Sequence, residues 1–153
     1  MPDLRLVLFQ PDIPQNTGSM LRLAACLGVD VDLIEPAGFL IDDRRMRRAG
    51  MDYLDHVALV RHASWDAYRT AARPGRLVLM TRWAEAAYHE FAFRANDSIM
   101  MGRETGGVPP EVADRADARI RIPMQPGLRS INVAVAAGMV LGEALRQTEG
   151  FEP

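Results

Sequence analysis

The sequence contains no lysine, a single cysteine, and no apolar run long enough to cross a lipid bilayer. All 18 basic residues among the 153 are arginine. We attribute this uniform choice to codon usage, because selection for positive charge alone would leave some lysine. The formal net charge of −2 provides no overall attraction to nucleic acid, so any RNA contact requires a local basic patch.

Other absences narrow the class of protein. Cys26 stands alone in an apolar stretch, which excludes a disulfide framework and a cysteine-based metal site, and we expect it in the core. His56, His62 and His89 lack the spacing of metal ligands. The N-terminus has no signal-peptide pattern, and the most apolar segment, 133–145, is too short to span a membrane. We therefore expect a cytoplasmic protein without a metal.

What the chain does have is an alternation of strand-like and helix-like segments. The predicted strands cover residues 4–9, 29–34, 57–60, 77–80, 98–101 and 118–122. The predicted helices cover residues 17–27, 65–72 and 110–115, followed by a final helix that starts near 130–132. This interleaving predicts an α/β fold with a largely parallel sheet. No linker, low-complexity tract or internal repeat divides the chain, so we expect one domain over residues 1–153.

A glycine-rich stretch, Gly102-Arg103-Glu104-Thr105-Gly106-Gly107, follows the predicted strand at 98–101. It is not a P-loop of the nucleoside triphosphatases, because no Gly-Lys-Ser/Thr follows. It is not a dinucleotide-binding fingerprint either, because its glycines have a different spacing. Taken alone, this stretch indicates a surface turn.

A second motif, Ile122-Pro123-Met124, leads into Ser130 and Asn132 at the start of the final helix. Ser or Asn at such a place commonly caps a helix, and a cap and a ligand contact can share one residue. The helix that follows is apolar nearly all round, so we expect its face to be buried. Gly138 and Gly142 would allow another backbone to approach closely.

Near the N-terminus, Asn16-Thr17-Gly18 precedes Arg22. Spacing alone favours a helix cap and a solvent-facing arginine there. The stretch Asp42-Asp43-Arg44-Arg45-Met46-Arg47-Arg48 is either a solvated, self-paired surface or a local patch for phosphates. By itself such a charge run usually indicates the solvated surface, and the phosphate patch gains equal weight only with the family resemblance given next.

In this order and with these separations, the three motifs resemble the signature motifs of the SPOUT superfamily of methyltransferases. The resemblance is to its TrmH-like branch and, within that branch, to the TrmL type. It implies S-adenosyl-L-methionine as cofactor, a homodimer that uses the final helix, and a C-terminal deep trefoil knot. The knot would be built from segments near Met80, Gly102, and Ile122 through Asn132.

The resemblance also implies roles for individual residues. The implied cofactor-binding residues are Met80, Gly102, Ile122 and Ser130. The implied catalytic residues are Arg22, Glu104 and Asn132. Candidates for contact with RNA are Asn16, Arg44, Arg45, Arg47 and Arg48. Because a guanidinium is always protonated, we expect Arg22 to anchor a phosphate or carboxylate rather than to act as the base. Arg103 and Gly106 depart from the TrmL pattern.

The reaction implied by the resemblance is methylation of a ribose 2′-hydroxyl in tRNA. The target would be the wobble cytidine or uridine in the anticodon stem-loop, with leucine tRNAs as candidate substrates. The alternatives are methylation of another tRNA or ribosomal RNA nucleotide, a non-catalytic RNA-binding protein of the same fold, and an unrelated α/β enzyme.

Overall fold

The computed structural model describes residues 3–39, 56–71 and 73–152. Its strands are β1 (Arg5–Phe9), β2 (Asp30–Ile34), β3 (Leu59–His62), β4 (Leu77–Met80), β5 (Ala86–Ala87), β6 (Ser98–Met101) and β7 (Ala118–Arg121). Its helices are α1 (Pro14–Leu27), α3 (Trp65–Thr70), α4 (Pro110–Arg115) and α5 (Val133–Gln147). Strands and helices alternate along the chain, which confirms the predicted α/β class.

The seven strands form one sheet in the order β3-β2-β1-β6-β4-β7-β5. All the strand pairings in the described residues are parallel, as the interleaved pattern predicts. β1 is an interior strand and pairs with both β2 and β6. Because the strands run the same way, their carboxyl ends and the loops that follow them share one edge of the sheet.

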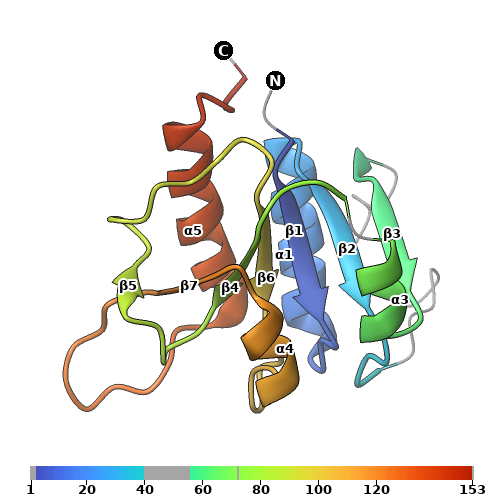
Figure 1. Cartoon of the computed structure of the whole chain (residues 1–153), viewed down its shortest axis with the longest axis horizontal. Coiled ribbons are helices and arrows are strands. Elements are labelled where there is room, and N and C mark those ends of the chain that lie inside the picture. Colours follow the sequence, from blue (N-terminus) through green and yellow to red (C-terminus); the bar gives the residue numbers. More distant parts are fainter. Residues whose placement is uncertain (1–2, 40–55, 72, 153) are drawn as a thin grey trace.

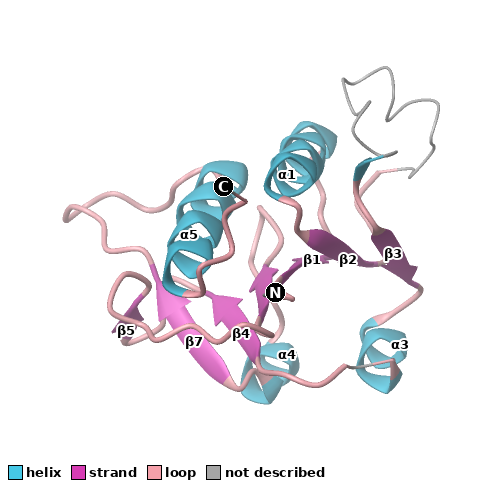
Figure 2. Cartoon of the chain, turned by 90° about the horizontal axis from the view of Figure 1, so that it is seen from above, coloured by secondary structure: helices cyan, strands magenta, loops and turns pink. Residues whose placement is uncertain are grey.

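Helices cover both faces of the sheet (Figures 1 and 2). Alternate residues of β1 point to opposite faces: Leu6 and Leu8 pack with α1 and α5, whereas Val7 and Phe9 pack with α3 and α4. Burial on both faces explains why these strands read as continuous apolar runs. None of the helices in the described ranges is both long and apolar enough to cross a membrane.

Several predicted boundaries differ from the structure. Helix α1 begins at Pro14, not at Thr17, because proline presets the helical φ angle at a first turn. Asn16 therefore lies inside the first turn, and the N-cap is Ile13, which gives no side-chain cap. Helix α3 ends at Thr70 rather than at residue 72.

Two strand predictions also need correction. Strand β3 lies two residues later than predicted, because its register with β2 places His62 beside Ile34. There the His62 Nε2 lies 2.8 Å from Asp32 Oδ1 in a buried pair. The two-residue β5 was not predicted, since Ala86-Ala87 carries no alternating pattern.

The expectation of a buried cysteine is wrong: Cys26 is exposed. Helix α1 presents one exposed stripe at helical spacing, consisting of Gln15, Ser19, Arg22 and Cys26. The opposite face of the helix packs on the sheet. Cys26 is exposed because helical spacing places it on the same face as Ser19 and Arg22.

Candidate active site

A cavity of about 790 Å³ lies where the chain leaves the carboxyl ends of β4, β6 and β7. Ligands of open parallel sheets bind at this edge, and the volume suits a small organic molecule. All four residues predicted to bind the cofactor line the cavity: Met80, Gly102, Ile122 and Ser130. Met80 ends β4, Gly102 follows β6, Ile122 follows β7, and Ser130 precedes α5, so the fold gathers residues that are up to fifty positions apart.

The glycine-rich loop folds back on itself beside the cavity. The backbones of Arg103 and Gly107 exchange two hydrogen bonds, each with an N–O distance of 3.0 Å. A Cβ on Gly102 would lie 2.9 Å from both the Cα and the carbonyl carbon of Gly107. Glycine at 102 is therefore required by this internal contact, whatever lies in the cavity.

Glu104 in the same loop is tied to the loop between β1 and α1. The Asp12 backbone N–H donates to Glu104 Oε2 at 3.0 Å, and the Glu104 N–H donates to Asp12 Oδ1 at 3.2 Å. The Thr105 hydroxyl also donates to Asp12. These bonds hold the Glu104 carboxyl at the cavity wall, and sequence reasoning missed Asp12 because it is 92 residues away.

The paired carboxyl groups have pKa values shifted in opposite directions. Burial, and then contact with Asp12, raises the pKa of Glu104. The hydrogen bond with the Glu104 side chain lowers the pKa of Asp12. Glu104 Oε1 is buried and has no hydrogen-bond partner among the described residues. A proton shared between the two carboxyl groups agrees with both pKa shifts.

Asn132 closes another side of the cavity by linking α5 to α1. Its Oδ1 accepts hydrogen bonds from the backbone N–H groups of Ala134 and Val135, so Asn132 is the N-cap of α5. Its Nδ2 donates to Asn16 Oδ1 at 3.0 Å. Both asparagines line the cavity.

One predicted catalytic residue, Arg22, is not brought to this cavity. Arg22 lies on the exposed stripe of α1 and is not part of the cavity lining. Arg44, Arg45, Arg47 and Arg48 lie outside the described residues. A single chain therefore assembles Glu104 and Asn132 at the cavity, but not Arg22.

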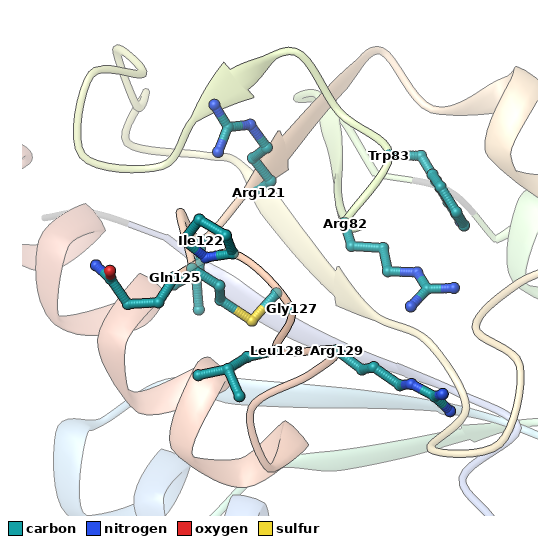
Figure 3. Close-up of a pocket in the computed structure, with 10 residues that line it drawn as sticks. Arg82, Trp83, Arg121, Ile122, Gln125, Gly127, Leu128 and Arg129 are labelled. Carbon is teal, nitrogen blue, oxygen red and sulfur yellow. The ribbon is translucent and has the colours of Figure 1, made fainter.

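A smaller hollow of about 370 Å³ adjoins the cavity (Figure 3). It is formed by the loop after β4 and the long loop between β7 and α5, and it contains Arg82, Trp83, Arg121 and Arg129. Sequence reasoning missed these residues. The Arg82-Trp83 pair, which follows the buried strand β4 after Thr81, could have indicated them. Loops that follow parallel strands at this edge of a sheet often form binding sites.

The described residues contain no group of three or more His, Cys, Asp or Glu side chains arranged to hold a metal ion. The one buried histidine of that part, His62, is paired with Asp32, which also accepts a 2.6 Å hydrogen bond from Arg5. This network joins β1, β2 and β3 and is structural.

Comparison with known proteins identifies the class. The sequence profile of the SpoU rRNA Methylase family matches residues 3–142, and the chain belongs to this family. The chain is 60% identical over 144 residues to a tRNA (cytidine(34)-2′-O)-methyltransferase of Beijerinckia indica, covering 93% of this chain and 90% of the relative. It is 42% identical over 146 residues to the enzyme of the same name in Escherichia coli, covering 94% and 93%.

Solved structures show the same similarity. A structure described as giving insights into the 2-OH methylation of C/U34 on tRNA has a TM-score of 0.88 and 42% identity, covering 96% of this chain and 91% of its own. The SpoU methyltransferase AviRb from Streptomyces viridochromogenes in complex with the cofactor AdoMet has a TM-score of 0.81 and 29% identity, covering 96% and 61%.

Proposed function

We propose that this protein methylates the ribose 2′-hydroxyl of nucleotide 34, the wobble nucleotide, in tRNA. The observation that carries the proposal is the cavity at the carboxyl ends of β4, β6 and β7. It combines Met80, Gly102, Ile122 and Ser130 with Glu104 and Asn132, and these residues come from separate segments. Relatives at up to 60% identity that are named for this reaction at position 34 support the choice of substrate. The proposed tRNA substrate supports a cytoplasmic location, which we also propose.

S-adenosyl-L-methionine is the proposed cofactor, and the cavity fits it in size and lining. Met80 and Ile122 supply apolar wall for an adenine ring, and the backbone of the loops after β6 and β7 supplies polar groups. Ser130 offers a hydroxyl at the start of α5. The cofactor, when bound, supplies an electrophilic methyl group on a sulfonium.

The chain's own residues would orient the acceptor and manage its proton. Glu104 is held by Asp12 and carries a carboxyl whose pKa is raised, so it is suited to receive or share a proton at the cavity wall. Asn132 is fixed by capping α5 and by its bond to Asn16. We propose that this amide pair positions the ribose, since holding the acceptor in line with the methyl group is the main task.

We propose that Arg22 anchors a phosphate next to the target ribose. Because Arg22 lies outside the cavity lining of its own chain, this role requires a second copy or an RNA segment that extends over α1. We propose a homodimer. Val135 and Met139 of α5 are 55% and 37% exposed, and a Cβ on Gly142 would meet nothing within 4 Å, so this face of α5 is open to a partner.

Two further features of the resemblance remain proposals. The loops that meet at the cavity are the segments from which the deep trefoil knot would be built, and we propose that one domain, residues 1–153, carries it. We also retain Arg44, Arg45, Arg47 and Arg48 as proposed contacts with tRNA phosphates.

The test is mapping of ribose methylation in tRNA incubated with the purified protein and S-adenosyl-L-methionine. We expect a 2′-O-methyl group at position 34, formed about a hundred-fold or more slowly when Glu104→Gln replaces the wild type. Methylation at another nucleotide, or none despite measurable cofactor binding, would contradict the proposal.

A further inference from the structure

Trp83 is the most exposed large apolar side chain in the described part of the chain, with 78% of its surface accessible. It lies in the loop between β4 and β5, at the rim of the cavity. A single exposed apolar residue needs no explanation, but a tryptophan in a hollow beside a binding cavity is the kind of residue that carries binding energy. Nothing in the fold of the described residues uses this ring for packing on the core.

Two arginines accompany the ring. The Arg82 guanidinium carbon lies 4.4 Å from the centroid of the Trp83 ring. In Figure 3 the side chains of Arg82 and Arg129 extend toward the side on which Trp83 stands, whereas Arg121 points away. Within the described ranges, neither Arg82 nor Arg129 forms an ion pair, and none of the ten residues that line the hollow is acidic. The hollow therefore combines a flat aromatic surface with positive charge that the fold leaves uncompensated.

The hollow is continuous with the cavity. Residues that line both are Arg82, Trp83, Ile122, Met124 and Arg129. A molecule with a reacting atom in the cavity can therefore extend over this rim into the hollow. If the reacting atom belongs to a ribose, the parts that reach the rim are a nucleobase and the adjoining phosphates.

We propose that Trp83 stacks on an unpaired nucleobase of the anticodon loop, while Arg82 and Arg129 contact the phosphates that flank it. The inference rests on the proposed function, since it names how the substrate of the same site is held. Single-stranded RNA is recognised by stacking of splayed bases on aromatic rings, with arginine contacts to the backbone. Stacking accepts any base, so this contact would supply affinity and position rather than sequence preference.

The first test observes the ring directly. The chain has two tryptophans, Trp65 and Trp83, so a Trp65→Phe variant leaves Trp83 as the only indole. We expect an anticodon stem-loop RNA to quench its fluorescence, and a blunt duplex of equal charge to quench it much less. Because Trp65 packs on Phe9 and Tyr68, the substitution could weaken the fold. The same titration is therefore also made with the otherwise unaltered chain labelled with 5-fluorotryptophan, in which one of two fluorine resonances should shift.

The second test uses variants and their matched control. Trp83→Ala should raise the dissociation constant for tRNA about ten-fold or more, with cofactor affinity unchanged, and Trp83→Tyr should retain most of the affinity. Arg82→Ala and Arg129→Ala should each lower the slope of log Kd against log salt by about one. Arg115→Ala removes an exposed arginine of α4 that lines neither the hollow nor the cavity, and it should change neither quantity.

Unchanged tRNA affinity in Trp83→Ala would overturn the inference. It would also be overturned if Trp83→Ala altered the sedimentation of the free protein but not RNA binding, since the hollow would then be a protein interface. A wild-type chain that transfers no methyl group to tRNA would instead refute the proposed function. The fluorescence signal does not depend on methyl transfer, so the two failures can be told apart.

Discussion

Glu104 and Asp12 set the chemistry of the candidate site at the scale of single residues. Two backbone–side-chain hydrogen bonds hold the carboxyl groups together, and the Glu104 pKa is raised while the Asp12 pKa is lowered. In the folded chain, Glu104 therefore holds its proton more strongly than in the unfolded chain. That contribution to stability is fully present below the ordinary pKa of 4.5 and is lost as the pH rises through the raised value. The contribution of Asp12 has the opposite sense: it is present above 3.8 and lost as the pH falls through the lowered value.

Glu104→Gln separates stability from activity. A glutamine amide can donate to Asp12 at every pH, so the variant should lose the decline in unfolding free energy above pH 4.5 and gain up to about 1 kcal/mol at neutral pH. Methyl transfer should fall by about a hundred-fold or more, because the carboxyl group is gone. Urea unfolding across a pH series, together with methyl-transfer assays, tests both parts. Wild-type turnover in Glu104→Gln would remove Glu104 from the mechanism.

Arg22 is proposed to act beside the target ribose, although it does not line the cavity of its own chain. Arg22→Ala should reduce methyl transfer by about a hundred-fold or more while leaving cofactor affinity nearly unchanged, because Arg22 lies outside the cavity lining. Arg22→Lys should restore little, since an ammonium keeps the charge but lacks the planar two-point contact. Full activity in Arg22→Lys would show that charge alone suffices. Full activity in Arg22→Ala would exclude the residue from the site.

At the scale of elements, loops after parallel strands build the site while strands and helices hold those loops in place. The loop after β6 is closed by the paired hydrogen bonds between Arg103 and Gly107, and the loop before α5 ends at the Asn132 cap. The loop after β4 supplies Arg82 and Trp83. Because the loops after β4 and β6 start from buried strands, the base of the cavity wall is held by the sheet.

Gly102→Ala tests the closure of the loop after β6. The added Cβ would lie 2.9 Å from the backbone of Gly107, which cannot rotate away as a side chain could. We expect a loss of about 1–3 kcal/mol in unfolding free energy, as for other overpacked sites, together with weaker cofactor binding. Thermal unfolding and calorimetry provide the two measurements. Unchanged stability would show that the loop accommodates a side chain, and the glycine would then need another explanation.

At the scale of the whole molecule, the exposed faces of α1 and α5 raise the question of a second copy. The two helices lie side by side on one face of the sheet (Figure 2), and the nearest atom to a Cβ built on Gly138 is Cδ2 of Leu23, at 3.8 Å. Val135 and Met139 remain exposed beside them. An apolar helix face that the chain leaves uncovered is the expected surface of a twofold dimer.

Gly142→Leu should weaken that dimer, because a leucine would add bulk where only glycine now stands. Sedimentation velocity should show a dimer for the wild type at micromolar concentration and a larger monomer fraction for the variant. Gly142→Ala is the control for helix propensity, since alanine favours the helix and adds little volume. A monomeric wild type would contradict the proposed dimer.

Mixing two inactive variants tests whether the site is shared between subunits. If Arg22 of one subunit serves the cavity of the other, a heterodimer of Arg22→Ala and Glu104→Gln contains one intact site. An equimolar mixture that is unfolded and refolded together should then recover about a quarter of wild-type methyl transfer. No recovery would place Arg22 and Glu104 in the same subunit's site.

The sequence by itself determined the types of elements and the family motifs. Three elements have the predicted bounds, namely β4, β6 and α4. Their bounds depend on apolar runs and turn residues, which can be recognised from adjacent positions in the sequence. The boundaries of α1 and β3 were wrong where a proline start and a long-range register decided them. The motif residues Met80, Gly102, Ile122 and Ser130 were chosen by resemblance, and the structure shows that they line one cavity.

The tertiary structure alone decided which residues meet. Asp12 reaches Glu104 across 92 positions, and Asn16 reaches Asn132 across 116. No periodicity connects such pairs, since their separation in space depends on the order of strands in the sheet. Exposure is also decided by tertiary structure. Trp83 and Cys26 are exposed because no element distant in the sequence packs over their side chains in the described part of the chain.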